Sequence, residues 1–296
     1  MTAPTRASAA GRAYLDLRKK ARQDRRPVDE LMQLYVLECF LARLADTTFA
    51  GRLVLKGGVL LAVFGERRPT RDVDLQAQAI VNEPAATLAM ITQIAAAGLD
   101  DGVAFDTTSA AAETIRDEDR YQGVRVSMTA SLATARLAFH VDVSAGDPIT
   151  PSPQHVRLPR ILGGEISLRG YPLAMVHAEK IVTATTRGTT STRWRDFADL
   201  YLLARHHPID GTELADSIRQ VARHRGTTLA PLSVVLAGYG AIGQQRWDAW
   251  RRKQRLDDRL PAQLNDVVTS VIAFADPPIN GTVARQTWNP GAGTWS

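Results

Sequence analysis

The chain has 296 residues, of which 45% are hydrophobic and 23% are charged, as expected for one large or two small folded domains. No apolar run approaches the roughly 18 residues of a membrane span, and the first residues lack the apolar core of a signal peptide. The single cysteine, Cys39, excludes an intrachain disulfide. The composition therefore argues against membrane-spanning and disulfide-rich secreted proteins, and we expect a cytoplasmic location.

The formal net charge is +5, from 36 Lys and Arg against 31 Asp and Glu. Such a surface is compatible with a nucleic-acid partner, because neutralising phosphates is the sequence-independent part of that binding. Residues 1–13 are small, polar and basic, and we expect a flexible leader. Residues 14–26 are strongly basic and indicate a helix that either touches RNA or is simply a solvated face.

Residues 27–50 form the clearest predicted helix. Leu31, Leu34, Leu41 and Leu44 follow the i, i+3, i+4 spacing of an apolar stripe. This helix is expected to pack on the sheet that carries the functional site.

Residues 53–75 contain the strongest chemical signal in the chain. A short apolar run ends at Lys56-Gly57-Gly58, and the apolar residues that follow could open a helix, where backbone N–H groups can approach a phosphate. Asp72 and Asp74 then stand one residue apart, and a strand over 72–78 would place both on the same face. Two neighbouring carboxylates repel unless a cation neutralises them, and Mg²⁺ typically takes one or two carboxylates plus substrate phosphates.

Further along, residues 84–97 predict a helix, residues 103–115 have no clear pattern, and residues 123–129 and 136–143 predict two strands. On the second strand Asp142 shares a face with His140, opposite the apolar residues. Asp142 is therefore a candidate third carboxylate beside Asp72 and Asp74, with Asp147 in the following turn as a competitor. We interpret His140 as structural.

Residues 148–169 are rich in Pro and Gly and predict a boundary region with one or two short strands. Helices are expected over 173–186, 195–205, 211–223, 244–256 and 261–275, followed by an irregular segment over 277–296. Near Trp247 and Trp250 lie several basic residues, which either grip RNA or form the charged side of a helix whose tryptophans are buried.

Gly57-Gly58 followed by Asp72-Val73-Asp74-Leu75 resembles the signature of the polymerase-β-like nucleotidyltransferase superfamily. With Lys56 before it and Thr70-Arg71 within it, the stretch resembles the AbiEii/MenT-type toxin nucleotidyltransferases of bacterial toxin–antitoxin pairs. One departure is visible. Many superfamily members have at position 58 a serine whose hydroxyl contacts triphosphate, whereas Gly58 offers only its backbone.

A second segment carries the same resemblance. Glu179-Lys180, followed by the run Arg193–Leu200, resembles a pattern in which a helix lysine and an R-D-x-x-D-L motif complete the active site. The resemblance implies that Lys180 contacts nucleotide phosphates and that Asp196 is a remote catalytic acid. Asp199 could serve instead, or could orient Lys180. From the residues alone, Lys180 could instead be a solvated lysine, and Asp196 could cap its helix and form a salt bridge to Arg193 or Arg195.

The resemblance implies an α/β (α+β) fold. We expect a polymerase-β-like nucleotidyltransferase domain with a small mixed sheet over residues 14–150, a mostly helical C-terminal domain over 151–276, and irregular tails over 1–13 and 277–296.

The implied activity is transfer of a nucleoside monophosphate from an NTP to an RNA acceptor, in several relatives the tRNA 3′ end, with Mg²⁺ and pyrophosphate release, which blocks translation. A cognate antitoxin is the implied protein partner. Asp72, Asp74, Lys180 and Asp196 would be catalytic, and Mg²⁺ would be held by Asp72 and Asp74, with Asp142 as a third ligand. The implied nucleotide-binding residues are Lys56, Gly57, Gly58, Thr70, Arg71 and Lys180.

Two alternatives remain open at the level of sequence. A nucleotidyltransferase that modifies a protein side chain or a small molecule would use the same residues on a different acceptor. A catalytically silent nucleotide-binding regulator would lack a catalytic residue, but Asp72, Asp74, Lys180 and Asp196 are all present.

Overall fold

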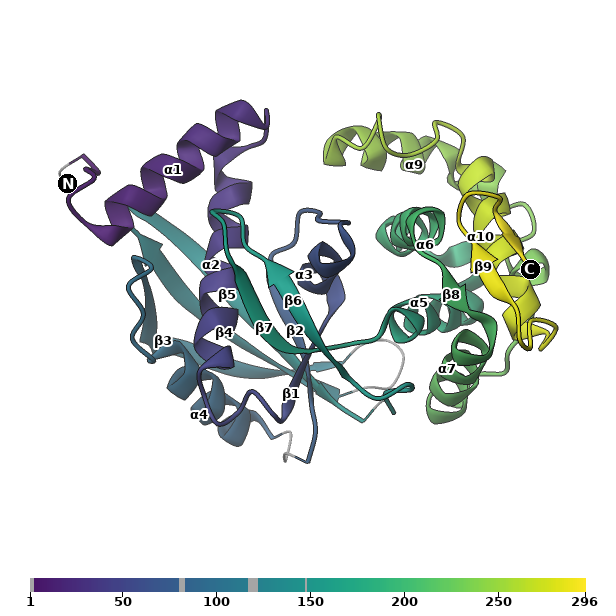
Figure 1. Cartoon of the computed structure of the whole chain (residues 1–296), viewed down its shortest axis with the longest axis horizontal. Coiled ribbons are helices and arrows are strands. Elements are labelled where there is room, and N and C mark those ends of the chain that lie inside the picture. The colour runs from purple at the N-terminus through teal and green to yellow at the C-terminus, as the bar shows by residue number, and fades with distance from the viewer. Residues whose placement is uncertain (1–2, 80–82, 117–121, 147) are drawn as a thin grey trace. The chain divides into compact units, whose positions relative to one another are not determined.

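A computed structural model of the chain describes residues 3–79, 83–116, 122–146 and 148–296. The chain divides into two compact units, one made of residues 1–146 and 154–170, the other of residues 147–153 and 171–296. The first unit is built around a mixed sheet and the second is mostly helical (Figure 1). The predicted α/β class is confirmed.

The first unit contains a seven-stranded sheet in the order β3-β4-β5-β2-β1-β7-β6. Its strands are β1 (Leu53–Lys56), β2 (Asp72–Ala77), β3 (Val103–Arg116), β4 (Gln122–Leu132), β5 (Ala135–Ala145), β6 (Gln154–Pro159) and β7 (Glu165–Gly170). The β2–β5 and β1–β7 pairs are parallel, and the other neighbours are antiparallel.

Its helical segments are α1 (Ala9–Gln23), α2 (Val28–Ala45), α3 (Gly57–Leu60), the 3₁₀ turn η1 (Leu61–Phe64) and α4 (Pro84–Ala95). Helix α2 runs along the sheet in Figure 1 and is buried over most of its length. The ring of Phe40 on α2 lies 5.0 Å from the ring of Phe139 on β5. Because successive side chains of a strand alternate between faces, the buried Phe139 and Val141 share one face and His140 and Asp142 lie on the opposite face.

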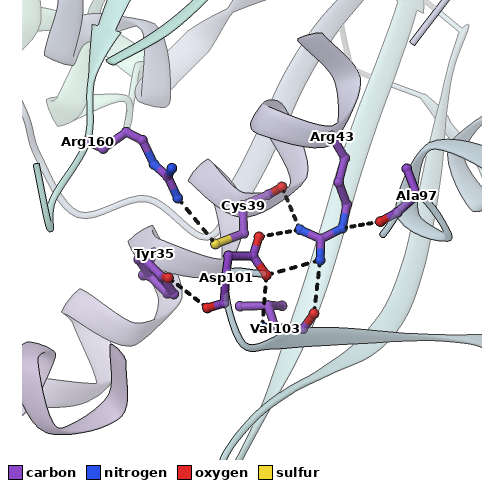
Figure 2. A network of polar contacts seen from close by, with 7 residues as sticks. All are labelled: Tyr35, Cys39, Arg43, Ala97, Asp101, Val103 and Arg160. Atoms are coloured by element: carbon purple, nitrogen blue, oxygen red, sulfur yellow. Dashed lines mark hydrogen bonds and ion pairs between the residues drawn. The ribbon is translucent and has the colours of Figure 1, made fainter. Parts of the chain in front are cut away.

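A buried ion pair fastens α2 to the start of β3 (Figure 2). Arg43 donates to the Asp101 carboxylate over 2.5 and 3.1 Å and to the backbone oxygens of Cys39, Ala97 and Val103 over 2.9 to 3.0 Å. The Tyr35 hydroxyl donates to the backbone oxygen of Asp101 over 2.8 Å. Every guanidinium nitrogen of Arg43 thus has a partner, as a buried charge requires. Burial also raises the pKa of Cys39, which agrees with its interpretation as a core thiol.

The boundary between the units differs from the sequence expectation of a division near residue 150. Strand β7 pairs with β1 through Leu55 and Gly170, and β6 pairs with β7, so residues 154–170 complete the first unit's sheet. The N-terminal segment also differs from the expected flexible leader. Helix α1 begins at Ala9, and the hydroxyl of Ser8 accepts a hydrogen bond from the Gly11 backbone N–H over 3.1 Å.

The second unit contains α5 (Leu173–Arg187), the 3₁₀ turn η2 (Gly188–Thr190), α6 (Trp194–His206), α7 (Gly211–His224), α8 (Leu232–Val235), α9 (Tyr239–Gln254) and α10 (Leu264–Ile279). A small antiparallel sheet in the order β10-β9-β8 joins β8 (Ile209–Asp210), β9 (Thr287–Asn289) and β10 (Thr294–Trp295). Among the described residues, no helix has the length and apolar character that a membrane crossing demands.

Residues 277–296 also differ from the expected irregular tail, because long-range packing orders part of this segment into β9 and β10. Trp288 on β9 is buried, its indole N–H donates to the Ala204 backbone oxygen over 2.6 Å, and its ring lies 5.0 Å from Phe274 of α10. Burial of a large aromatic side chain of this kind stabilises an otherwise turn-rich segment.

Candidate active site

A row of charged residues crosses the polar face of the first unit's sheet. The strand registers place Lys56 of β1 opposite Asp74, Asp74 opposite Asp142 of β5, and Asp142 opposite Arg125 of β4. Directly opposed residues of neighbouring strands share a face. The signs along the row run plus, minus, minus, plus, so two carboxylates meet only between β2 and β5. Asp72 lies on the same face of β2, two residues before Asp74.

The electrostatics of Asp74 reflect this crowding. Burial raises the pKa of Asp74 to about 6, and the negative charges of Asp142 and Asp72 act in the same direction. Lys56 and a hydrogen bond from the Gly58 backbone N–H oppose the shift. Three carboxylates stand against the two cations Lys56 and Arg125, and Arg125 is bound to Asp142, so a further cation beside Asp72 and Asp74 would relieve the repulsion.

The first glycine of the motif is required by its closeness to Asp74. Gly57 has a φ of +65°, and a Cβ built on it would lie 1.9 Å from an Asp74 carboxylate oxygen. Any side chain at position 57 would therefore be strained and would collide with the acid. With glycine at position 57, the backbone at the end of β1 can lie directly against the Asp74 side chain.

The second glycine is packed against Thr70. A Cβ built on Gly58 would lie 2.8 Å from the Thr70 hydroxyl oxygen and 3.1 Å from a guanidinium nitrogen of Arg68. The Thr70 hydroxyl thus occupies the space beside position 58 that a serine side chain would use. Thr70 therefore places a hydroxyl near the position where other superfamily members have the serine hydroxyl that Gly58 lacks.

Asp142 lies beside Asp74 as the sequence predicted, but its carboxylate is engaged. Arg125 donates from Nε to one oxygen and from Nη2 to the other, both over 2.7 Å. The pKa of Arg125 is raised chiefly by this hydrogen-bonded pairing. Sequence analysis missed Arg125. Its alternation with Gly123 and Ser127 was visible, but its position opposite Asp142 depends on the two-residue turn at Ala133-Thr134 that sets the register of β4 and β5.

The remaining predicted residues of the first unit are placed as follows. Arg71 is exposed, and its backbone oxygen accepts a hydrogen bond over 3.3 Å from Gln33 of α2. His140 lies opposite Asp72, and its Nδ1 is 2.8 Å from the Ser127 hydroxyl oxygen. Asp147, the competitor of Asp142, lies outside the described residues.

Two acids of this face, Asp72 and Asp74, fit a divalent cation as a pair. A complete cage of protein ligands is not present, since over the described ranges no three His, Cys, Asp or Glu side chains gather in a way that could hold a metal ion. Asp72 and Asp74 remain as a pair on one strand, with the hydrogen-bonded Asp142 adding negative charge beside them. A pair of carboxylates that leaves the other positions to water and phosphate oxygens matches the preference of Mg²⁺.

The second unit contains a lysine held between two carboxylates. Lys180 Nζ on α5 donates to Asp196 Oδ1 and Asp199 Oδ2 on α6, both over 2.8 Å. The side chain of Asp199 is only 3% exposed, whereas those of Lys180 and Asp196 are 14% and 18% exposed. Arg193 lies 3.7 Å from the other oxygen of Asp196. The solvated-lysine interpretation is therefore wrong, because both carboxylates hold the Lys180 ammonium group.

Known proteins resemble this chain over most of its length. The family model described as "Nucleotidyl transferase AbiEii toxin, Type IV TA system" matches residues 39–270. No curated protein matches the chain. Among solved structures, a candidate nucleotidyltransferase from H. pylori has 15% identity and a TM-score of 0.48, covering 85% of this chain and 95% of that one. JHP933 from Helicobacter pylori has 15% identity and a TM-score of 0.47, covering 85% and 93%.

Proposed function

The chain belongs to the AbiEii family of nucleotidyl transferase toxins of type IV toxin–antitoxin systems, and we propose that it transfers a nucleoside monophosphate from an NTP to an RNA acceptor. Membership implies an NTP substrate and an antitoxin partner. The observation that carries the proposal is the meeting of Asp72, Asp74 and Asp142 on one sheet face, directly beside Lys56 and the backbone of Gly57-Gly58.

Asp72 and Asp74 would hold Mg²⁺, which when bound neutralises phosphate charge and makes the attacking hydroxyl more acidic. The chain's own residues fix this pair. The Gly58 N–H and the Lys56 charge both favour the ionised form of Asp74, and the parallel pairing of β2 with β5 sets its position. Thr70 offers a hydroxyl for a phosphate oxygen beside Gly58, and the exposed Arg71 offers a cation. Positioning and charge stabilisation supply most of the catalysis in such reactions.

The proposed transfer needs no reagent other than the NTP and the acceptor. An acceptor hydroxyl oxygen forms a bond to the α-phosphorus of the NTP, the bond between that phosphorus and the α–β bridging oxygen breaks, and pyrophosphate leaves. The hydroxyl proton is lost to solvent. The acceptor gains one nucleotide and presents a new hydroxyl.

In the second unit, Lys180 is proposed to bind nucleotide phosphates and Asp196 to act as the remote acid. The difference in burial between the two carboxylates supports this division. Asp199 is almost fully buried and accepts a hydrogen bond from Lys180, so it serves to orient the ammonium group, whereas Asp196 is the more accessible acid.

The proposed acceptor is the 3′ end of tRNA, and its extension would block translation because an altered end cannot be aminoacylated or used by the ribosome. The net charge of +5 supports an RNA acceptor. Since NTPs and tRNA occur together in the cytoplasm, we place the activity there.

The test uses purified protein, Mg²⁺, each α-labelled NTP in turn and total tRNA. Wild-type protein should label tRNA, and Asp72→Asn should lower the initial rate at least about 100-fold, since it removes one ligand of the proposed cation. Glu165→Gln, which neutralises an exposed acid on β7, is the matched control and should keep the wild-type rate.

Label in a protein or small-molecule fraction, but none in RNA, would move the acceptor to one of those classes. An Asp72→Asn variant that labels tRNA at the wild-type rate would show that this acid pair is not the catalytic site.

A further inference from the structure

The positive charge of the chain is concentrated in its first 26 residues. This segment holds eight of the 36 Lys and Arg and only two of the 31 Asp and Glu, so it carries a net charge of +6. The other 270 residues hold 28 Lys and Arg against 29 Asp and Glu, for a net charge of −1. The basic character of the protein thus comes from helix α1 and its flanks.

Helix α1 is firmly docked on the first unit. Leu17 is fully buried, and Ala13 and Ala21 are buried on the same side. Near the start of the helix the chain packs so closely that a Cβ built on Gly102 would lie 2.3 Å from Ala10 Cα. The buried side fixes which residues of α1 point outward.

The outward side is a stripe of cations. Arg12, Arg18, Lys19 and Arg22 are all exposed, and at 3.6 residues per turn they fall within about 120° of the helix circumference. We name these four residues the α1 basic face. The two acids of the segment are bound elsewhere, Asp16 by Arg6 over 2.6 Å and Asp24 by Lys20 over 3.1 Å. Across the described residues, none of the four cations pairs with a carboxylate.

An aromatic ring adjoins this stripe. The guanidinium carbon of Arg18 lies 5.9 Å from the ring centroid of the half-buried Tyr14. Basic side chains beside an aromatic ring are suited to a nucleic-acid backbone and a stacked base. A membrane surface fits less well, because interfacial helices insert large apolar residues and Leu17 of α1 is buried in the protein instead.

The other basic segment of the chain is a weaker candidate. Trp247 on α9 is fully buried, donates its indole N–H to the Pro261 backbone oxygen over 3.1 Å and stacks on Trp250 at 5.3 Å. Arg251 is paired with Asp257 over 3.1 Å. Trp247 of α9 therefore serves packing, and the ring of the half-buried Trp250 is stacked on it.

We propose that the α1 basic face binds the phosphate backbone of the RNA acceptor. The proposal rests on the proposed function for the identity of the substrate, but it involves separate residues. Helix α1 ends at Gln23, before the family match begins at residue 39, and its four cations are distinct from the proposed catalytic and nucleotide-binding residues. The helix would act as a docking element that raises the affinity for RNA without taking part in the transfer.

The experiment measures direct binding of labelled tRNA to the full chain at several salt concentrations. The test variant is R12Q/R18Q/K19Q/R22Q. The matched control is R223Q/R246Q/R252Q/K253Q, which also removes three exposed arginines and one exposed lysine, here from α7 and α9. Circular dichroism melts of both variants establish that they are folded.

The α1 variant should weaken tRNA binding at least about tenfold and lower the slope of log K against log salt by roughly 3, since each lost phosphate contact removes just under one unit. The control should change affinity by less than about threefold. Labelling of tRNA by the α1 variant should show a raised KM for tRNA and a kcat close to that of wild type.

Equal losses in the two quadruple variants would reduce the effect to overall charge and overturn the proposal. So would wild-type affinity in the α1 variant, or α1-dependent binding to anionic vesicles in place of tRNA. Failure of the proposed function has a different signature, namely α1-dependent tRNA binding without any transfer of label, which would support the docking role alone.

Discussion

At the scale of single residues, the hydrogen-bond partner of a carboxylate determines whether it is available as a metal ligand. Asp142 stands beside Asp74 in the sheet register, where a third metal ligand was expected, yet both its oxygens accept hydrogen bonds from Arg125. A carboxylate held by a bidentate arginine contributes charge to its surroundings, but one lone pair of each oxygen is directed at the guanidinium. We infer that Asp72 and Asp74 are the protein ligands and that Asp142 acts at a distance.

The variant Arg125→Met/Asp142→Asn tests this inference, because it removes both charges of the pair and leaves their sum unchanged. Its affinity for Mn²⁺, measured by calorimetry with a non-hydrolysable NTP analogue, should stay within about threefold of wild type. Arg125→Met alone frees the Asp142 carboxylate and should tighten binding or add a second ion. A loss of more than about 100-fold in the double variant would instead identify Asp142 as a ligand, because residues outside the ligand shell are typically worth about 10- to 100-fold.

Thr70 offers a second test at this scale, since its hydroxyl lies beside Gly58. Thr70→Val removes the hydroxyl at nearly constant volume and should raise the KM for NTP about tenfold, as expected for one hydrogen bond of roughly 1 to 1.5 kcal/mol. Thr70→Ser keeps the hydroxyl and should resemble wild type. Equal KM values for the valine and serine variants would remove Thr70 from the nucleotide site.

His177 connects a single buried side chain to the pH dependence of stability. It is fully buried on α5, its ring lies 4.7 Å from Phe274, and within the described part of the chain neither ring nitrogen has a hydrogen-bond partner. Burial lowers its pKa to about 3, with Lys180 and His207 acting in the same direction. The folded state therefore keeps His177 neutral over a pH range in which the unfolded chain, with a pKa near 6.5, takes up a proton.

The resulting stability is complete above about pH 6.5 and is lost as the pH falls towards 3, at up to about 1.4 kcal/mol per pH unit. His177→Phe removes the titrating group while keeping a ring against Phe274. The urea midpoint of wild type should therefore fall relative to that of the variant between pH 7 and pH 5. If the urea midpoints of the two proteins changed by the same amount between pH 7 and pH 5, the lowered pKa of His177 would be contradicted.

At the scale of elements, the Arg43–Asp101 pair shows how α2 is fixed to the sheet. Both side chains are buried, and removing one partner leaves an uncompensated charge. Arg43→Met should lower the free energy of unfolding by about 3 to 5 kcal/mol, measured by urea denaturation. Arg219→Met, which breaks the exposed pair with Asp216, should cost about 1 kcal/mol or less. Similar costs for the two variants would mean that the buried network does not stabilise the unit.

The sequence predicted those elements whose pattern is local. Period-two alternation was visible around Asp74 and Asp142, and both lie on strands of the sheet. Strand β3 was ambiguous because it is an edge strand whose alternation of exposed residues changes phase at an irregularity between Asp106 and Ala111. Its apolar alternation is correspondingly weak, so no face could be assigned from residues 103–115.

Features that depend on distant contacts could not be read in the same way. Strands β6 and β7 join the first unit only because β7 pairs with β1, more than 100 residues earlier. Strand β9 exists because Trp288 packs on Phe274 and Ala204. Arg125 became part of the candidate site through a strand register, which the residues alone do not fix.

At the scale of the whole molecule, the proposed roles are divided between separate groups of residues. The carboxylate cluster and the α1 basic face belong to the first unit, and the Lys180 cluster to the second. Catalytic variants such as Asp72→Asn should therefore retain tRNA affinity, and α1 variants should retain kcat. A shared loss of both properties in either variant would contradict this division.

The most direct measurement compares two positions of the label in the same NTP. Wild-type protein is incubated with Mg²⁺, tRNA and either α-labelled or γ-labelled NTP, and the RNA is resolved on a denaturing gel. Nucleotidyl transfer predicts that the α-label enters tRNA, that the γ-label is released in pyrophosphate, and that Asp72→Asn lowers the rate of both at least about 100-fold. A γ-label found in RNA would indicate phosphoryl transfer, and the absence of the α-label from RNA would contradict the proposed activity.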